Sequence, residues 1–266
     1  MSEDWRSYDG IAGRYDAAWA PRFQQVAAHL SRRLPTRERE RILDVGSGTG
    51  IVARVLQADR PDARVIGCDR AIPMLRQLAA RTPRIAAVAA TATALPFARD
   101  TFTIATASFV LSHLPECEVA VREIHRVLAR GGVFAASAWA PASDPYAPAW
   151  SECLTRVIPK ERVQQAFSDV TPSEDYLAQP GALAAVLERA GFARVEQETI
   201  DVNIDVTLDQ FVADRQLNSA ARLAQSTVGA KRWADFLSMA RETLHARFGS
   251  SIRYTRQAHI AIGRHS

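Results

Sequence analysis

The sequence predicts an α/β protein in which a doubly wound, mostly parallel sheet is covered by helices on both faces. The first observation is the alternation of short apolar runs, such as residues 42–45 and 102–107, with segments of helical periodicity. The second is the glycine-rich turn at 46–50, which directly follows an apolar run and precedes a helical pattern. Strands that alternate with helices at this spacing form a parallel sheet, because each helix carries the chain back to the same edge.

The first half of the chain follows this alternation element by element. The first 35 residues have a helical pattern that carries aromatic side chains, and Pro35 with the charged run 36–41 links it to the first strand. Pro61, Pro83 and the polar turn at 99–100 mark later boundaries. We predict strands at 42–45, 63–69, 85–90, 102–107 and 133–139, and helices at 51–58, 72–81 and 116–128, with Gly131 and Gly132 ending the last helix.

The alternation breaks after Trp139. Residues 141–179 contain five of the 13 prolines and only short helical patterns. We predict next a helix at 181–190 that Gly191 ends, a strand at 195–204, a long helical stretch at 208–248 and a last strand at 253–262.

Gly46, Gly48 and Gly50 form a G-x-G-x-G turn between the first strand and its helix. Glycine has no Cβ, so the backbone of such a turn can approach a ligand closely. The dinucleotide fingerprint requires a glycine where this chain has Ile51, and the lysine of the nucleotide-hydrolase phosphate loop is absent as well. A turn that accepts a nucleoside without gripping a phosphate indicates S-adenosylmethionine.

Asp69 ends the second predicted strand. In a βαβ unit, an acid at this place faces the ribose, and its two oxygens accept hydrogen bonds from both hydroxyl groups. S-adenosylmethionine and NAD both present such a ribose, so the glycine spacing is what favours the former.

In their order and spacing, these segments resemble the class I S-adenosylmethionine-dependent methyltransferases. The group concerned, methyltransferase type 11, includes the ubiquinone and menaquinone biosynthesis methyltransferases and many bacterial natural-product enzymes. The resemblance implies a Rossmann-like sheet of seven strands, the last one antiparallel, with helical insertions that form a lid over the open edge of the sheet. The matching stretches are 8–16, 42–50, 65–74, 92–97, 102–115 and 122–132, and the match is good over residues 5–140.

At 266 residues, the chain can hold one large domain with sizeable insertions. With the resemblance, we expect five segments along it. The N-terminal helices and cofactor-binding core occupy 1–140, a helical lid insertion 141–179, a core helix and strand 180–206, a second helical lid insertion 207–252, and the final core strand 253–266.

The cofactor contacts are expected in the turns after the first four strands, because ligands of doubly wound sheets lie outside the carboxyl ends of the strands. By resemblance, Asp44 reaches the cofactor's amino group; alternatively, it only caps the turn. Relatives usually carry an acid for the adenine amino group where this chain has Thr91. The Thr91 hydroxyl would make a neutral hydrogen bond to the adenine, which is weaker than the charge-assisted bond of an acid. Alternatively, backbone groups of Thr91 and Ala92 alone bind the adenine. The other expected contacts are Gly46, Ser47, Gly48, Gly50 and Asp69 for methionine and ribose, Arg70 and Met74 near the adenine, and Ser108 and Phe109 at the methionine end.

The acceptor end of the predicted site contains His113, in a segment that opens onto the substrate in relatives. His113 is expected either to take a proton from a hydroxyl or an acidic carbon of the acceptor, or to shape the pocket through a loop hydrogen bond. Tyr8 and Tyr15 are expected to fold over cofactor and substrate, with Tyr15 taking part in catalysis, unless both are core aromatics. Trp139 is expected to form a wall of the acceptor pocket.

Composition limits the other classes of function. The net charge of +4 comes from arginines spread along the chain and only two lysines, so it does not indicate nucleic-acid binding. No apolar run approaches the roughly 18 residues of a spanning helix, and a signal-peptide layout is absent, so stable membrane insertion is not expected. The three cysteines show no metal or disulfide spacing. We therefore expect a cytoplasmic monomer or homodimer without a metal site.

The leading hypothesis is an enzyme that methylates the oxygen or carbon of a small molecule, a secondary metabolite or quinone-like acceptor. Transfer would be in line, with S-adenosylhomocysteine as product. A hypothesis from another class is a methyltransferase-fold protein that binds the cofactor but catalyses a cyclisation or rearrangement. An RNA or protein methyltransferase lacks support, because residues 108–111 do not form an Asn-Pro-Pro-Tyr-type motif and no binding domain is appended.

Overall fold

The computed structural model describes residues 5–141 and 144–266. Residues 1–4 and 142–143, which fall within the predicted core and the first predicted insertion, lie outside the described residues. The first half contains η1 (Asp9–Ile11), α1 (Ala12–Arg33), β1 (Arg41–Val45), α2 (Ile51–Asp59), β2 (Arg64–Asp69), α3 (Ile72–Arg81), β3 (Ala86–Ala89), β4 (Phe102–Ser108), η2 (Leu111–His113), α4 (Cys117–Val127) and β5 (Leu128–Trp139). The second half contains α5 (Ala147–Leu154), α6 (Lys160–Val170), α7 (Glu174–Leu177), α8 (Ala182–Arg189), β6 (Ala193–Thr207), α9 (Leu208–Arg215), α10 (Ser219–Phe248) and β7 (Ser251–Arg264).

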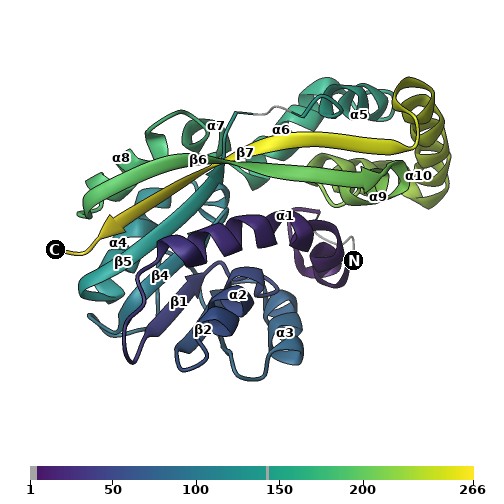
Figure 1. Cartoon of the computed structure of the whole chain (residues 1–266). Helices are drawn as coiled ribbons and strands as arrows, with labels where there is room; N and C mark the ends of the chain where they lie inside the picture. The colour runs from purple at the N-terminus through teal and green to yellow at the C-terminus, as the bar shows by residue number, and fades with distance from the viewer. Residues whose placement is uncertain (1–4, 142–143) are drawn as a thin grey trace.

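These described strands form one seven-stranded sheet in the order β3-β2-β1-β4-β5-β7-β6 (Figure 1). Strands β1 to β5 pair in parallel, and β7 runs antiparallel to both of its neighbours, β5 and β6. The predicted doubly wound sheet with an antiparallel final strand is thus confirmed. The strand order reverses between β1 and β4, which is where such sheets leave a crevice for a ligand.

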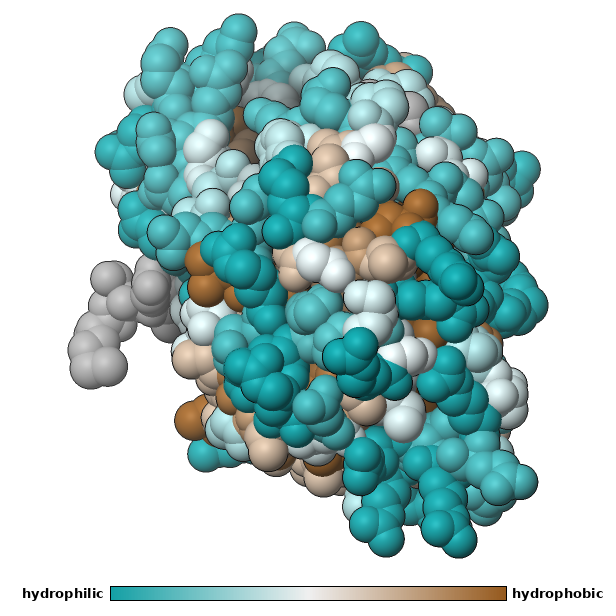
Figure 2. Space-filling view, turned by 90° about the vertical axis from the view of Figure 1, so that its left-hand side faces the viewer, coloured by the Kyte–Doolittle hydropathy of each residue, from teal (hydrophilic) through white to brown (hydrophobic). Residues whose placement is uncertain are grey.

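Two buried clusters cover the opposite faces of the sheet. Neighbouring residues of a strand point to opposite faces, so Ile42 packs in the cluster that contains Leu30 of α1 and Leu56 of α2. Leu43 packs in the other cluster, with Ile124 of α4 and side chains of α8. Both faces of the sheet are therefore buried, while hydrophilic residues predominate on the outer face of the molecule shown in Figure 2.

The helix predicted at 116–128 ends close to the expected place, but the prediction that Gly131 and Gly132 end it was wrong. Helix α4 ends at Val127, because Leu128 already has extended backbone and pairs with Phe102 of β4. Leu128 is fully buried, so its place in the sheet core draws the chain out of the helix before the glycines. The glycines instead lie in β5 near a register shift, where Gly131 has a φ of 72°.

Strands β6 and β7 continue well beyond the rest of the sheet. The pairing of β7 with β5 stops at Ala258, whereas its pairing with β6 continues to Ser251. Helices α5, α6, α9 and α10, called here the helical group, gather around this two-stranded extension (Figure 1). They share a third buried cluster that includes Trp150, Phe211 and Phe236. The two predicted insertions therefore pack on each other, beyond the carboxyl ends of the parallel strands.

The long helical stretch predicted at 208–248 is divided. Thr207 caps α9 through a reciprocal capping box with Gln210, and a break at 216–218 separates α9 from α10. Within α10, Gly229 has non-helical backbone with a φ of 79° and a ψ of 168°. None of the helices in the described ranges is long and apolar enough to cross a membrane.

Candidate active site

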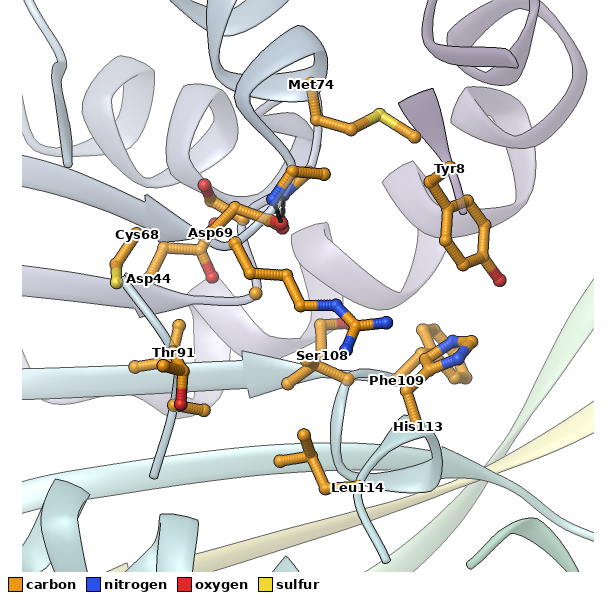
Figure 3. A pocket seen from close by; sticks show the side chains of 18 of the residues that line it. Tyr8, Asp44, Cys68, Asp69, Met74, Thr91, Ser108, Phe109, His113 and Leu114 are labelled. Atoms are coloured by element: carbon orange, nitrogen blue, oxygen red, sulfur yellow. Dashed lines mark hydrogen bonds between the residues drawn. The ribbon is translucent and has the colours of Figure 1, made fainter. Parts of the chain in front are cut away.

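A cavity of about 670 Å³ lies at the carboxyl ends of β1, β2 and β4, beside the reversal of strand order (Figure 3). In Figure 3, Asp44 and Asp69 lie toward one end of it, and Tyr8 and His113 toward the other. The volume falls in the range of ligand-binding pockets. Of the predicted site residues, the structure brings to its lining Tyr8, Tyr15, Asp44, Gly46, Ser47, Gly48, Asp69, Arg70, Met74, Thr91, Ala92, Ser108, Phe109 and His113. It does not bring Gly50 or Trp139 there.

The three glycines of the turn have different surroundings, although all have a positive φ. A Cβ on Gly46 would lie 2.2 Å from Val110 Cγ2, and one on Gly50 would lie 2.2 Å from Leu78 Cδ1. A Cβ on Gly48 would meet no described atom within 4 Å. Gly46 and Gly50 are therefore required by close packing inside the protein, and Gly48 is the position at which the backbone is open to a ligand.

Ser47 lies between two of these glycines and is only 9% exposed. Its Oγ is buried and has no hydrogen-bond partner among the described residues. A Cβ on Gly67 of β2 would come within 2.9 Å of this hydroxyl, so the small residue in β2 makes room for it. An unpaired buried hydroxyl costs free energy, which a ligand that hydrogen-bonds to it would recover.

Asp69 joins the end of β2 to the glycine turn. Its Oδ2 accepts a hydrogen bond from the Gly48 amide, and its Oδ1 accepts one from the Ala71 amide, both at 2.8 Å. Burial raises the pKa of this carboxyl, and the two amide hydrogen bonds oppose the rise. Each oxygen has further lone pairs, so a carboxylate held in this way can still accept from the two hydroxyls of a ribose.

Asp44 is 2% exposed at the end of β1. Its Oδ1 accepts from the Thr106 hydroxyl at 2.8 Å, and its Oδ2 accepts from the Ala53 amide in the first turn of α2 at 3.2 Å. Burial raises the pKa of Asp44 to about 7. Asp44 thus makes a capping hydrogen bond, as expected if it only caps the turn. It also borders the cavity, as a contact with the cofactor's amino group requires.

At the predicted adenine end, Thr91 uses its hydroxyl locally. Its Oγ1 lies 2.6 Å from Thr93 Oγ1 and accepts from the Thr93 amide at 3.1 Å. The segment that follows is bound by an ion pair of α4, between Glu123 and Arg126. Glu123 accepts a hydrogen bond from the Leu95 amide, and Arg126 donates one to the Leu95 carbonyl. The backbone around Ala92 is therefore held in place without an acid at Thr91.

The imidazole of His113 is oriented by a helix from the helical group. Its Nδ1 lies 2.9 Å from the carbonyl oxygen of Val170, the last residue of α6. A carbonyl can only accept, so Nδ1 carries the proton and Nε2 is left as the acceptor of the neutral ring. Burial lowers the pKa of His113, and the positive charges of Arg70 and Arg222 lower it further. The ring is therefore neutral near pH 7 and able to take a proton.

Aromatic side chains of the N-terminal segment stand next to His113. The Tyr8 ring lies 5.5 Å from the His113 ring and 5.7 Å from the Tyr15 ring, edge to face in both pairs. Burial raises the pKa of Tyr8 to about 12 and that of Tyr15 well above its ordinary value. Both phenols therefore remain protonated near neutral pH, so Tyr15 can donate a hydrogen bond but is not a base.

Trp139 lies one layer behind the cavity. It packs on Phe109, with ring centroids 4.4 Å apart, and Phe109 borders the cavity. Phe109 has a φ of 58°, a left-handed backbone that costs a bulky residue free energy and that tends to persist at functional sites. The Arg256 guanidinium lies 4.0 Å from the Trp139 ring centroid. Trp139 therefore supports the wall that Phe109 forms instead of forming it.

Sequence reasoning missed Asp16, which fastens α1 to the glycine turn. Its Oδ1 accepts from the Thr49 hydroxyl at 2.6 Å, and its carboxylate also pairs with Arg54 and Arg81. Asp16 belongs to the N-terminal run that resembles the family, so a signal was present there. Sequence reasoning also did not predict that Phe23 lines the cavity, although Phe23 continues the aromatic pattern of α1.

No group of His, Cys, Asp and Glu within the described ranges could hold a metal ion.

The glycine turn, the acid at the end of β2 and the strand order with antiparallel β7 define the fold and site of a class I S-adenosylmethionine-dependent methyltransferase. Residues 43–136 match the model of a family described as a methyltransferase domain. The chain is 32% identical over 202 residues to a demethylmenaquinone methyltransferase of Streptomyces griseus, covering 71% of this chain and 85% of that protein. The chain therefore belongs to this family of S-adenosylmethionine-dependent methyltransferases, in the group related to the ubiquinone and menaquinone enzymes.

Solved structures show the same fold. Phosphoethanolamine N-methyltransferase 2 of Haemonchus contortus, in complex with S-adenosyl-L-methionine, matches with a TM-score of 0.61 and 15% identity, over 99% of this chain and 60% of that chain. The cyclase SpnF matches with a TM-score of 0.53 and 18% identity, over 91% of this chain and 80% of that chain. At these identities the likeness concerns the fold alone, and the fold is shared by a methyltransferase and a cyclase.

Proposed function

We propose that this enzyme methylates an oxygen or carbon of a small, largely apolar, quinone-like or secondary-metabolite acceptor, with His113 as the base that removes the acceptor's proton. One observation carries the proposal. A single cavity places the open backbone of Gly48 and the carboxylate of Asp69 together with a neutral histidine whose Nε2 can accept a proton.

The residues at the nucleoside end fit S-adenosylmethionine. Asp69 would accept from the ribose hydroxyls, the backbone at Gly48 would lie against the ligand, and the unpaired Ser47 hydroxyl would find a partner. Asp44, buried beside them, would receive the amino group. The cofactor supplies an electrophilic methyl group, so the protein needs to position the acceptor and accept its proton.

The acceptor end favours a flat apolar substrate. Tyr8, Tyr15, Phe23 and Phe109 all border the cavity there, and faces of aromatic side chains suit the rings of a quinone-like compound. The similarity to demethylmenaquinone methyltransferase supports the same choice of acceptor. The acceptor must carry an acidic proton within reach of His113, and a phenolic hydroxyl satisfies this. Removal of that proton makes the oxygen, or the ring carbon next to it, nucleophilic; a methylated ring carbon then loses its own proton to restore the aromatic ring.

The helical group supports a role as a lid. Two consecutive residues at the end of α6 reach the site: Asp169 pairs with Arg6 of the N-terminal segment at 2.6 Å, and Val170 binds His113. Arg6 and Tyr8 both border the cavity. Movement of the helical group away from the sheet would therefore open the acceptor end and remove the carbonyl that orients His113. Its return would exclude water from the cavity during transfer.

The test is to incubate the protein with S-adenosylmethionine carrying a labelled methyl group and a panel of hydroxylated quinones and phenols. We expect label in one class of acceptor and equimolar S-adenosylhomocysteine. The His113→Gln variant is expected to bind S-adenosylhomocysteine as the wild type does but to transfer the label poorly. If substrate is converted to an isomer while the bound cofactor is not consumed, the protein catalyses a rearrangement and the proposal is wrong.

A further inference from the structure

The acceptor end of the cavity is bordered by residues 6–8, and a helix more than 200 positions away in the sequence contacts this segment. Arg222 lies in the first turn of α10 and is only 8% exposed, although its side chain is charged. Its guanidinium donates a hydrogen bond to the carbonyl oxygen of Ser7. It also lies over the next residue, with its Cζ 5.1 Å from the centroid of the Tyr8 ring. One side chain of α10 thus contacts both the backbone and a ring of the segment that borders the cavity.

The two contacts of Arg222 restrict Tyr8 in different ways. Residues 5–8 belong to no helix or strand, so contacts from elsewhere decide where the Tyr8 side chain points. The hydrogen bond to Ser7 fixes the backbone just before Tyr8, because a guanidinium donates in fixed directions from the edge of its plane. The attraction between a cation and the face of an aromatic ring fixes the orientation of the Tyr8 ring.

Tyr8 in turn contacts His113. The two ring centroids lie 5.5 Å apart, and the ring planes are almost perpendicular, at 89°. In Figure 3, the Tyr8 hydroxyl points toward the side of the cavity where the His113 ring lies. The imidazole is therefore oriented by α6, through the carbonyl of Val170, and bounded by a ring that α10 holds in place.

Tyr8 and His113 together offer one hydrogen-bond donor and one acceptor to the cavity. Burial raises the pKa of Tyr8 to about 12, so its hydroxyl stays protonated and can donate. The Nε2 of the neutral His113 can accept. This pair suits a molecule with a hydroxyl group, which donates to His113, and a second oxygen next to it, which accepts from Tyr8. Such two-point binding depends on the placement of Tyr8 beside His113.

We propose that Arg222 is a positioning residue for the acceptor: from α10 it holds Tyr8 beside His113, so that these two side chains select an aromatic acceptor with two neighbouring oxygen atoms. Arg222 itself does not border the cavity and acts through Tyr8. The inference rests on the proposed function, because it needs His113 to receive the hydroxyl group of the acceptor.

The first measurement concerns the contact between the two rings and needs no turnover. Nuclear Overhauser effects between ring protons of Tyr8 and His113 are recorded on the full chain with isotope-labelled tyrosine and histidine. The two signals are assigned by their loss in Tyr8→Phe and His113→Gln. We expect the effect in the wild type and its loss in Arg222→Gln. An effect that is absent from the wild type, or that persists in Arg222→Gln, overturns the proposal.

Arg247→Gln is the matched control on the same helix. Arg247 is also a cation beside a ring, with its Cζ 5.3 Å from the Phe248 centroid, but it is 57% exposed and does not border the cavity. This variant should keep the ring contact and all the affinities of the wild type. If it loses the ring contact as Arg222→Gln does, the effect reflects a general change of α10 and the proposal is wrong.

The second measurement is calorimetric binding of 2,3-dihydroxynaphthalene and 2-naphthol, which differ by one oxygen, to the protein saturated with S-adenosylhomocysteine. The wild type should prefer the former by about tenfold, the value of one hydrogen bond. Arg222→Gln should lose this preference and still bind S-adenosylhomocysteine as the wild type does, whereas Arg222→Lys, which retains the charge, should keep part of it. In the Tyr8→Phe background, Arg222→Gln should change the preference no further. No preference in the wild type, or an unchanged one in Arg222→Gln, overturns the proposal.

The outcomes separate this inference from the proposed function. If the protein does not bind S-adenosylhomocysteine or methylates no acceptor, the proposed function fails, while the ring contact still decides whether Arg222 places Tyr8. Should Arg222→Gln not fold, Arg222→Lys takes its place in both measurements. A ring contact and a preference equal to those of the wild type in Arg222→Lys would then overturn the proposal.

Discussion

Alanine at two glycines of the same turn should act on different properties, mainly on cofactor binding at Gly48 and mainly on stability at Gly50. A Cβ at Gly50 would lie 2.2 Å from Leu78 Cδ1, whereas a Cβ at Gly48 would meet no described atom within 4 Å. Both residues have a positive φ, 84° at Gly50 and 53° at Gly48. Gly50→Ala therefore perturbs packing, and Gly48→Ala perturbs the surface offered to the ligand.

The magnitudes follow from these contacts. Left-handed backbone costs a residue with a Cβ about 1–2 kcal/mol, and this applies to both variants. Forcing an extra methyl group against the fully buried Leu78 adds about 1–3 kcal/mol for Gly50→Ala alone. We therefore expect losses of unfolding free energy of about 1–2 kcal/mol for Gly48→Ala and about 2–5 kcal/mol for Gly50→Ala.

Urea denaturation measures these losses, and calorimetry measures the affinity for S-adenosylhomocysteine. Gly48→Ala should bind it at least about tenfold more weakly, which corresponds to about 1.4 kcal/mol, while Gly50→Ala should lose less affinity than stability. A double-mutant cycle with Leu78→Ala isolates the clash. The double variant should be more stable than the sum of the single losses predicts, by about 1–3 kcal/mol.

The reasoning is refuted by either of two results. If Gly50→Ala unfolds at the same urea concentration as the wild type, the packing argument fails. If Gly48→Ala binds S-adenosylhomocysteine as tightly as the wild type, the ligand does not approach the turn at that residue.

Three further changes test the rest of the site. His113→Gln should lower the turnover of the accepted substrate by about 10²–10⁴-fold. Because the pKa of His113 is lowered, the base is already neutral above pH 6.5. Wild-type turnover should therefore be flat above pH 6.5 and decrease only below it. Turnover that still rises with pH above 6.5 would contradict a base whose pKa is lowered. Asp44 is less acidic in the folded chain, with a pKa of about 7 against 3.8, so its contribution to stability is complete below 3.8 and is lost as the pH rises to about 7. The unfolding free energy of the wild type minus that of Asp44→Asn, measured in urea, should therefore decrease over this interval, and a constant difference would show that burial does not perturb this carboxyl. Asp69→Ala removes a charged hydrogen-bond acceptor and should weaken calorimetric binding of S-adenosylhomocysteine by about 10–150-fold, with Asp201→Ala on exposed β6 as the control; unchanged binding by Asp69→Ala would remove Asp69 from the ribose site.

The core of the fold was open to prediction because its signals are local. Each strand of the parallel sheet is a short apolar run followed by a turn and a helical period, so the pattern around Ile42 or Phe102 needs no knowledge of distant residues. Asp69 could be placed for the same reason, since the end of a parallel strand in a doubly wound sheet is always at the ligand edge. The alternation of residues and the glycine turn thus determined the sheet, its class and the nucleoside end of the cavity.

The acceptor end was decided by tertiary structure. The tautomer of His113 depends on the carbonyl of Val170, which is 57 positions away in a helix without a recognisable motif. The sequence showed the glycines of the turn as equivalent, but Leu78 and Val110 give Gly50 and Gly46 packing roles that Gly48 lacks. Trp139 was displaced from the cavity by Phe109, whose left-handed backbone no local pattern indicates. Residue pattern determines which side chains are buried, because burial follows from periodicity. Which neighbour each side chain meets depends on how distant segments pack, and that sets the protonation and shape of the site.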